Sequence, residues 1–225
     1  MRQHFASNTS GNDYVVGDVH GDYERLTDFL AVIKFDKTVD RLFSVGDLID
    51  RGPASASCLD LLDEAWFFSV LGNHEKMMID ASANPADDME LWVQNGGEWG
   101  LELDPTALAH YAAVLAKLPL VITVGEGANR FNVFHAEFFG DDLALDRPSY
   151  SNHVREQLLW GRMLIRDPNK KDLHKGLSKS FCGHTPVKSP KQIGSHVFID
   201  TGCGYPNRTG TLTIVRASDM VFFEG

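Results

Sequence analysis

One local pattern occurs three times near the start of the sequence and constrains the fold more than any other feature. A short apolar run ends in a glycine turn, polar residues follow at once, and the next residues have helical spacing. The polar clusters begin at Gly17, Gly46 and Gly72. Strands that alternate with helices are typical of an α/β fold, in which ligands gather at the carboxyl ends of the strands. The pattern therefore predicts an α/β fold with its chemistry at those strand ends.

The rest of the sequence extends this alternation. Apolar periodicity predicts helices over 22–34 and 55–64 and mainly helical structure over 84–118, interrupted by a loop rich in glycine and tryptophan at 94–100. Residues 141–180 are expected to mix helix and loop. Further strands are predicted at 120–124, 131–134, 181–182, 197–199, 211–215 and 221–223, and the alternation in 211–215 indicates a half-buried antiparallel strand.

Composition narrows the class of protein. The 225 residues suffice for one large domain, and no linker or repeat divides them, so we expect a single domain over 1–225. A formal charge of −10 argues against a nucleic-acid or anionic-membrane partner. Three widely spaced cysteines, with no apolar leader and no apolar run of membrane-spanning length, favour a soluble protein of the cytoplasm.

Polar side chains of the kind that bind metals follow five of the predicted strands. Asp18 and His20 are two residues apart, so in an extended segment both point to the same side. Each such residue alone has a structural explanation, as a helix cap, a packed histidine or a turn residue. Their recurrence at five strand exits favours one shared site. The candidates are Asp18, His20, Asp47, Asp50, Arg51, Asn73, His74, His135 and His184.

The chemistry of these donors indicates the kind of ion. Carboxylate, imidazole and amide oxygen, without thiolate, suit divalent Mn, Fe, Zn or Co. Six candidate ligands are too many for one tetrahedral ion and suit two ions that share a carboxylate. Two metals about 3.5–4 Å apart can hold both oxygens of a phosphate and generate a nucleophile near neutral pH.

Six short blocks then identify a family by their order. They read GDVHG at 17–21, GDLIDRG at 46–52, GNHE at 72–75, FHA at 134–136, WGR at 160–162 and GHT at 183–185. This order resembles the phosphoprotein phosphatase family of metallophosphoesterases. The length, the two tryptophans Trp92 and Trp99, and FIDTG at 198–202 make the chain most similar to the short bacterial and phage branch, typified by the phage lambda protein phosphatase.

The resemblance implies a fold and a metal site. The fold would be the calcineurin-like metallophosphoesterase fold, a central β-sandwich of mixed sheets flanked by helices. Two divalent metal ions would bind, with Mn²⁺ expected first and Fe, Zn, Co or Ni as alternatives. Asp18 and His20 would hold the first ion, Asp47 would bridge to the second, and the remaining ligands of the second would be Asn73, His135 and His184.

The resemblance also implies catalytic roles. His74 would be the general acid that protonates the leaving oxygen, and Asp50 would fix its tautomer. Arg51 and Arg162 would grip the phosphate oxygens bidentately. A hydroxide bridging the two metals would attack the phosphate directly, without a phosphoenzyme. Where larger eukaryotic members have two glycines, this chain has Ala136 and Glu137, and we expect Glu137 to be a solvated loop residue rather than a partner of a ligand histidine.

Three functions are open from these residues. The leading hypothesis is a phosphatase for phosphoserine and phosphothreonine in proteins, with phosphotyrosine as a further substrate and no regulatory subunit evident. The alternative is a symmetric bis(5'-nucleosyl)-tetraphosphatase, which shares the early blocks but generally lacks an aspartate at the position of Asp50, before Arg51. A non-catalytic phosphate-binding module is the third, and the intact set of candidate ligands argues against it.

Overall fold

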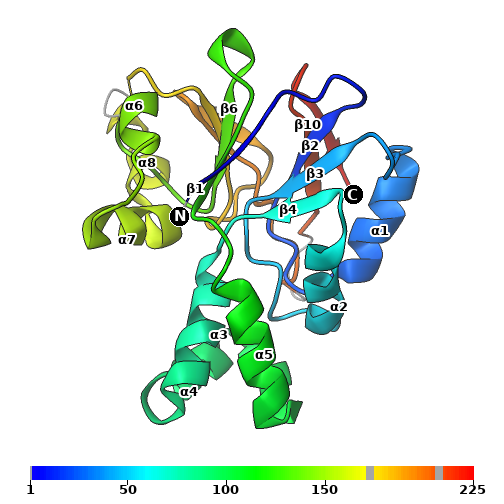
Figure 1. Ribbon diagram of the computed structural model, residues 1–225, viewed down its shortest axis with the longest axis vertical. Coiled ribbons are helices and arrows are strands. Elements are labelled where there is room, and N and C mark those ends of the chain that lie inside the picture. The colour runs from blue at the N-terminus through cyan, green and yellow to red at the C-terminus, as the bar shows by residue number, and fades with distance from the viewer. Residues whose placement is uncertain (1, 171–174, 206–209) are drawn as a thin grey trace.

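Two mixed β-sheets pack face to face at the centre of a computed structural model that describes residues 2–170, 175–205 and 210–225 (Figure 1). The five-stranded sheet has the order β11-β10-β2-β3-β4, with β2 (Asp13–Val16), β3 (Arg41–Ser44), β4 (Phe67–Ser69), β10 (Thr213–Arg216) and β11 (Val221–Glu224). The six-stranded sheet has the order β1-β5-β6-β7-β9-β8, with β1 (Arg2–Phe5), β5 (Val121–Val124), β6 (Phe131–Phe134), β7 (Lys179–Cys182), β8 (Lys191–Ile193) and β9 (His196–Phe198).

The strands of the opening pattern are parallel neighbours, as the alternation predicts. β2 pairs with β3 and β3 with β4, all parallel, and Val15 stands opposite Phe43. Successive side chains of a strand point to opposite faces, so Val15 enters the core between the sheets while Tyr14 and Val16 pack toward the helices. Because both faces are buried, the strands are continuous apolar runs rather than alternating ones. β10 pairs antiparallel with β2, as predicted for 211–215, but its first three residues are all buried, so the strand is not half-buried as predicted.

Helices cover the two outer faces of the sandwich (Figure 1). On the five-stranded sheet lie α1 (Tyr23–Val32) and α2 (Ser55–Asp60), which runs into η1 (Leu61–Asp63). On the six-stranded sheet lie α6 (Asp142–Leu145), α7 (Asn152–Trp160) and α8 (Met163–Arg166). The short turn η4 (Gly127–Asn129) joins β5 to β6. The expected β-sandwich of mixed sheets flanked by helices is therefore confirmed.

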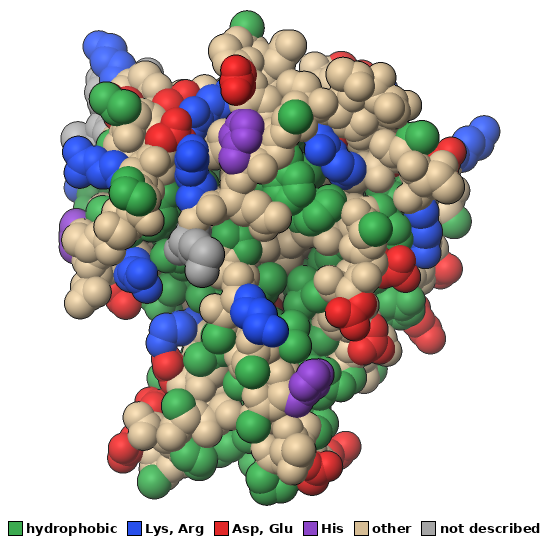
Figure 2. Space-filling model, in the orientation of Figure 1, with side chains coloured by type: hydrophobic (Ala, Val, Ile, Leu, Met, Phe, Trp, Pro, Cys, Tyr) green, Lys and Arg blue, Asp and Glu red, His purple; other side chains and the backbone are tan. Residues whose placement is uncertain are grey.

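A helical lobe, residues 73–115, projects from one end of the sandwich (Figure 1). It comprises α3 (Asn73–Ala83), α4 (Pro85–Trp92), the π-helical turn η2 (Val93–Gly97), the 3-10 turn η3 (Glu98–Glu102) and α5 (Pro105–Leu115). α5 begins where the Asp104 carboxylate accepts hydrogen bonds from two backbone N–H groups. Acidic side chains gather near the tip of the lobe (Figure 2), in keeping with the two aspartates in the first turn of α4.

The structure differs from the sequence prediction at three further places. The segment 94–100, predicted as a loop, is wound into η2 and η3, with Gly96 at a φ of 106° taking up the change of direction. β1 and β8 were not predicted, because both are short, partly polar strands that lie at the two edges of the six-stranded sheet.

Among the described residues, no helix is long and apolar enough to cross a membrane.

Candidate active site

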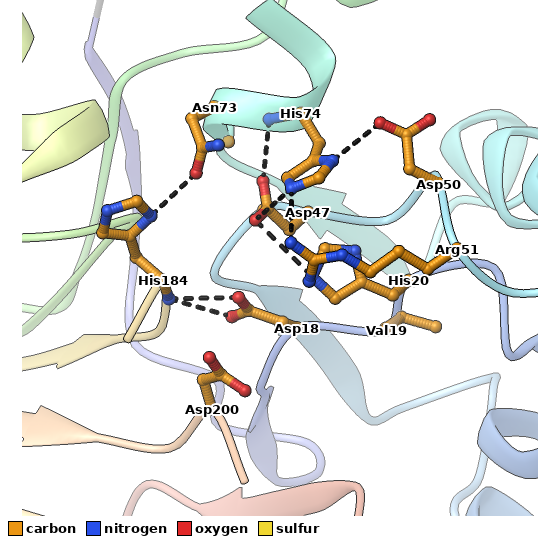
Figure 3. Close-up of polar contacts among 12 residues, drawn as sticks. Asp18, Val19, His20, Asp47, Asp50, Arg51, Asn73, His74, His184 and Asp200 are labelled. Carbon is orange, nitrogen blue, oxygen red and sulfur yellow. Dashed lines mark hydrogen bonds and ion pairs between the residues drawn. The ribbon is translucent and has the colours of Figure 1, made fainter. Parts of the chain in front are cut away.

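The polar residues predicted from the sequence meet where strands of both sheets end (Figure 3). Residues 18 and 20 follow β2, residues 47–51 follow β3, and residues 73 and 74 open α3 just after β4. From the second sheet, residue 135 follows β6 and residue 184 follows β7. Arg162, which directly precedes α8, also lies at this site. The convergence at carboxyl ends of strands is what the α/β pattern predicts.

The side chains form two groups that share one carboxylate. Potential ligand atoms of His20, Asp47 and His74 lie within 4.8 Å of one another, and those of Asp47, His135 and His184 do the same. All five residues are buried. In Figure 3, Asp47 lies between the imidazoles of His20 and His74 on one side and the side chain of His184 on the other.

The amide oxygen of Asn73 belongs to the second group. Its Oδ1 lies 2.8 Å from Nε2 of His135 and 2.7 Å from Nδ1 of His184. His135 can donate its other ring nitrogen, Nδ1, to the carbonyl oxygen of Val45 at 2.8 Å. His20 can likewise donate Nδ1 to the carbonyl oxygen of Ile49 at 3.0 Å. Each imidazole then turns the lone pair of Nε2 toward the site, the orientation that metal-binding histidines need.

Asp18 lies beside the two groups, and its carboxylate is held by the backbone. It accepts a hydrogen bond from the backbone N–H of His184, with oxygens at 3.0 and 3.3 Å. Glycine is required at position 183 for this approach, because a Cβ there would stand 1.8 Å from Oδ1 of Asp18. The hydrogen bond between Asp18 and His184 therefore connects the loop after β2 of one sheet with the loop after β7 of the other.

Burial and charge together favour cations between these side chains. The three carboxyl groups of Asp18, Asp47 and Asp200 are almost fully buried in one place. Burial and the neighbouring carboxylates raise the pKa of Asp18 well above its ordinary value, and burial raises the pKa of Asp200 to about 6. Bound divalent cations would compensate this buried negative charge.

Two of the three candidate ligand histidines, His20 and His184, are in the neutral form that metal binding requires. Burial, reinforced by the neighbouring His135, lowers the pKa of His184 to about 3. Burial also holds the pKa of His20 well below its ordinary value, so both imidazoles are neutral at pH 7. Burial lowers the pKa of His135, but the neighbouring Asp47 outweighs it and raises that pKa above its ordinary value. Burial alone would raise the pKa of Asp47, but the imidazoles of His135 and His74 outweigh it and hold that pKa well below the usual range. Neutral imidazole and ionised carboxylate are the forms that bind metals.

Another buried carboxylate, that of Glu75, holds the loop that carries Asp47. Its oxygens accept hydrogen bonds from the backbone N–H groups of Asp47 and Gly72, both at 2.9 Å, and of Leu48 at 2.8 Å. Burial and the nearby Asp47 raise the pKa of Glu75 to about 7. No role was predicted for Glu75, and its place in the GNHE block was the only signal for it in the sequence.

The loop geometry at the site is strained. Of the seven non-glycine residues with positive φ in the described part of the chain, five are the candidate residues His20, Asp47, Asp50, Arg51 and His184. Such left-handed backbone costs of order 1–3 kcal/mol per residue and persists where the surroundings impose it, commonly at functional sites.

An imidazole–carboxylate pair and two arginines border the metal-type ligands. Nδ1 of His74 lies 2.7 Å from Oδ2 of Asp50. Arg51 donates to Nε2 of His74 at 2.9 Å and also contacts Nε2 of His20. Arg162 donates through Nε to Nε2 of His184 at 2.9 Å. One guanidinium therefore lies at each of the two groups, where both could bind one anion.

Two features near the arginines were not predicted. The guanidinium of Arg51 lies over the ring of Tyr205, 4.3 Å from its centroid, a cation–π contact that no local sequence pattern reveals. Glu137 is neither a solvated loop residue nor a partner of a ligand histidine. Its buried carboxylate accepts hydrogen bonds from the backbone N–H groups of Met163 at 2.8 Å and Leu164 at 2.7 Å, so it fixes the start of α8 beside Arg162.

Comparison with known proteins identifies the family and agrees with the fold. A sequence profile described as calcineurin-like phosphoesterase matches residues 14–207. The chain is 35% identical, over 90% of its own length and 90% of the relative's, to serine/threonine-protein phosphatase 1 of Salmonella typhimurium. It is 46% identical, with 94% of each chain covered, to a symmetrical bis(5'-nucleosyl)-tetraphosphatase of Nitrosospira multiformis. A crystal structure provisionally described as a diadenosine tetraphosphatase superposes with a TM-score of 0.69 at 22% identity, covering 99% of this chain and 98% of the other.

Proposed function

Because the chain belongs to the calcineurin-like phosphoesterases, we propose that it is a metal-dependent protein phosphatase that hydrolyses phosphoserine and phosphothreonine. The similarity to a bacterial serine/threonine-protein phosphatase over nearly the whole chain supports this substrate class. We extend the proposal to phosphotyrosine as a further substrate, since the chemistry at phosphorus is the same for each ester.

We propose that the two groups of ligand atoms hold two divalent ions, with Mn²⁺ as the expected ion. His20 and Asp47 of one group would hold the first ion together with the neighbouring carboxylate of Asp18, which leaves His74 for the acid role. The second would share Asp47 and add the side chains of Asn73, His135 and His184. Bound there, divalent ions supply Lewis-acid chemistry that polarises a phosphate and lowers the pKa of water.

The two arginines would bind the substrate. The guanidiniums of Arg51 and Arg162 contact imidazole nitrogens of His74 and His184, which are weak partners for a cation. A phosphate oxygen is a stronger acceptor and matches the planar guanidinium bidentately. In an acidic chain these two side chains supply the local positive charge that orients the phosphate.

The observation that carries the proposal is the pair formed by His74 and Asp50. Asp50 accepts the Nδ1 proton, so Nε2 of His74 is the nitrogen that faces the arginines and the metal-type ligands. A protonated Nε2 can transfer its proton to the leaving oxygen of a serine or threonine ester, a poor leaving group that needs an acid. Hydrolysis of a phosphomonoester thus uses the metal-type ligands, the two arginines and the His74–Asp50 pair that the site brings together.

The relative named as a symmetrical tetraphosphatase supports a second candidate function, hydrolysis of a dinucleoside tetraphosphate. That reaction releases a nucleotide, a better leaving group than an alcohol, and depends less on a general acid. The position of Asp50 directly before Arg51 and its bond to His74 therefore favour the phosphomonoester.

Competing substrates test the proposal directly. With Mn²⁺ supplied, kcat/KM should be higher for phosphoserine and phosphothreonine peptides than for diadenosine tetraphosphate. His74→Asn should lower kcat on the peptides about 10²- to 10⁴-fold. His110→Asn, an exposed position on α5, is the matched control and should leave kcat unchanged. Faster turnover of the dinucleotide, or near-normal turnover by His74→Asn, would contradict the assignment.

We place this activity in the cytoplasm. Cys58, Cys182 and Cys203 are buried and unpaired, as expected for reduced thiols. Burial raises the pKa of Cys58 and Cys203 to about 12, so neither is a reactive thiolate at neutral pH.

A further inference from the structure

Two tryptophan indoles bind the carboxylate that orients His74. The Nε1–H of Trp92 donates to Asp50, 2.9 Å from Oδ2 and 3.1 Å from Oδ1. The Nε1–H of Trp99 donates to Oδ1 at 2.8 Å. Both tryptophans lie in the helical lobe, more than forty residues along the chain from Asp50. The segment 94–100, rich in glycine and tryptophan, therefore reaches into the site through Trp99.

Two glycines of this segment leave room for the indole ring of Trp92, which any side chain at their positions would displace. A Cβ at Gly97 would stand 2.5 Å from Nε1 of Trp92, and one at Gly100 would stand 2.1 Å from Cη2. The ring is fully buried as a result. The carbonyl oxygen of Gly96 accepts the backbone N–H of Arg51 at 2.9 Å. The turns η2 and η3 thus fix both the indole donors and the backbone of the loop that carries Asp50.

The N–H groups around the side chain of Asp50 leave it only the role of a hydrogen-bond acceptor. An indole N–H can donate a hydrogen bond and cannot accept one, so the Asp50 oxygens are the acceptors in both tryptophan contacts. The backbone N–H of Asp50 is itself fixed by Oγ of Ser55 at 2.9 Å. With its oxygens held in place by N–H donors, Asp50 can meet His74 only as an acceptor of the Nδ1 proton. That arrangement reserves Nε2 for proton transfer.

We propose that Trp92 and Trp99 are positioning residues for proton donation: they hold the carboxylate of Asp50 aimed at His74, and so set the tautomer and direction of the general acid. The inference rests on the proposed phosphatase function and adds a specific use for the helical lobe. Neither indole is needed to touch the substrate. Loss of either N–H should weaken the acid without weakening the binding of phosphate.

The leaving group of the substrate separates this role from a structural one. Trp99→Phe and Trp92→Phe keep a six-membered aromatic ring and remove the pyrrole ring that carries the N–H. Trp66→Phe is the matched control, because its Nε1 donates to Glu64 at 2.9 Å, away from the site. Trp99 is only half-buried, so its variant should fold even where that of Trp92 does not. Far-ultraviolet circular dichroism and a thermal melt should establish that each variant is folded.

Phosphoserine peptide and phenyl phosphate have poor leaving groups. On these substrates each tryptophan variant should lower kcat about 10- to 100-fold, the usual effect of removing a hydrogen-bond partner of a residue that binds the reacting groups. On p-nitrophenyl phosphate, which needs little acid assistance, kcat should change less than about twofold. KM should be unchanged throughout, and Trp66→Phe should match wild type. An equal loss on all substrates, or no loss on any, would overturn the proposal.

A measurement without turnover tests the inference separately from the function. In metal-free protein, the ¹⁵N chemical shifts of the His74 imidazole report its tautomer. Wild type should show a single Nδ1–H form, and Trp99→Phe should show a mixture or a reversed tautomer. An unchanged tautomer in both tryptophan variants would refute the positioning role. Absence of phosphatase activity in wild type, with the tautomer shift present, would instead refute the proposed function and leave the indole contacts standing.

Discussion

Asp200 provides the sharpest test of the electrostatic description of the site. Its carboxyl group is 2% exposed and faces Asp18 in Figure 3, and its Oδ1 accepts the backbone N–H of Gly202 at 2.9 Å. Burial raises its pKa from 3.8 to about 6. A carboxyl group whose pKa is higher in the folded protein stabilises the fold below about pH 4, and this contribution is lost as pH rises through 6.

The size of the effect follows from the shift. A difference of one unit between the pKa values of the folded and unfolded states corresponds to about 1.36 kcal/mol. The shift of Asp200 from 3.8 to about 6 therefore destabilises the metal-free folded state by about 3 kcal/mol above pH 7. Asp200→Asn removes the titration, and its amide oxygen can still accept the hydrogen bond from Gly202. We therefore expect the metal-free variant to be about 3 kcal/mol more stable than wild type at pH 8 and nearly equal to it at pH 4.

Urea denaturation of metal-stripped protein at pH 4 and pH 8 measures this difference. The matched control is Asp60→Asn, on the exposed end of α2, which should shift neither free energy of unfolding. Addition of Mn²⁺ should remove the advantage of Asp200→Asn, because bound cations favour the ionised carboxylates of wild type. A stability difference that is the same at both pH values, or that is absent at pH 8, would refute the electrostatic reasoning.

Two further predictions concern the phosphate site and the metals. Glu137→Ala removes the acceptor of the first N–H groups of α8 and should loosen Arg162, so kcat/KM on phosphopeptide should fall about tenfold, chiefly through a higher KM. The control Glu126→Ala, at an exposed position, should have no effect on kcat/KM. Equal kcat/KM values for the two variants would show that Glu137 does not support Arg162. Exhaustive chelation should abolish phosphatase activity and Mn²⁺ should restore it, as a steady-state assay would show; activity that survives chelation would exclude a metal-dependent reaction.

The sequence predicts the part of the fold that follows from local pattern. Apolar runs closed by glycine turns place β2, β3 and β4 in order, and the parallel arrangement brings the polar residues after them to one end. The candidate ligands could be named because each lies directly after a strand. The two edge strands β1 and β8 carry no such pattern, since β1 is mostly polar and β8 mostly exposed.

The contacts that support the site could not be read from spacing. Trp99 and Asp50 are far apart in sequence, and no periodicity indicates that the indole reaches the carboxylate. Glu137 was misjudged for the same reason, because its partners at the start of α8 follow it by more than twenty residues. Residues that bind the reacting groups follow strand ends, whereas residues that hold them are placed by the packing of the lobe and of α8 against the loops.

Two metal ions that share the carboxylate of Asp47 would be visible in a crystal grown with Mn²⁺ and measured by anomalous diffraction. The geometry predicts two anomalous peaks, one beside His20 and Asp18 and one beside His135 and His184, with the Asp47 carboxylate contacting both. A single peak, or two peaks of which only one touches Asp47, would show that Asp47 is not shared.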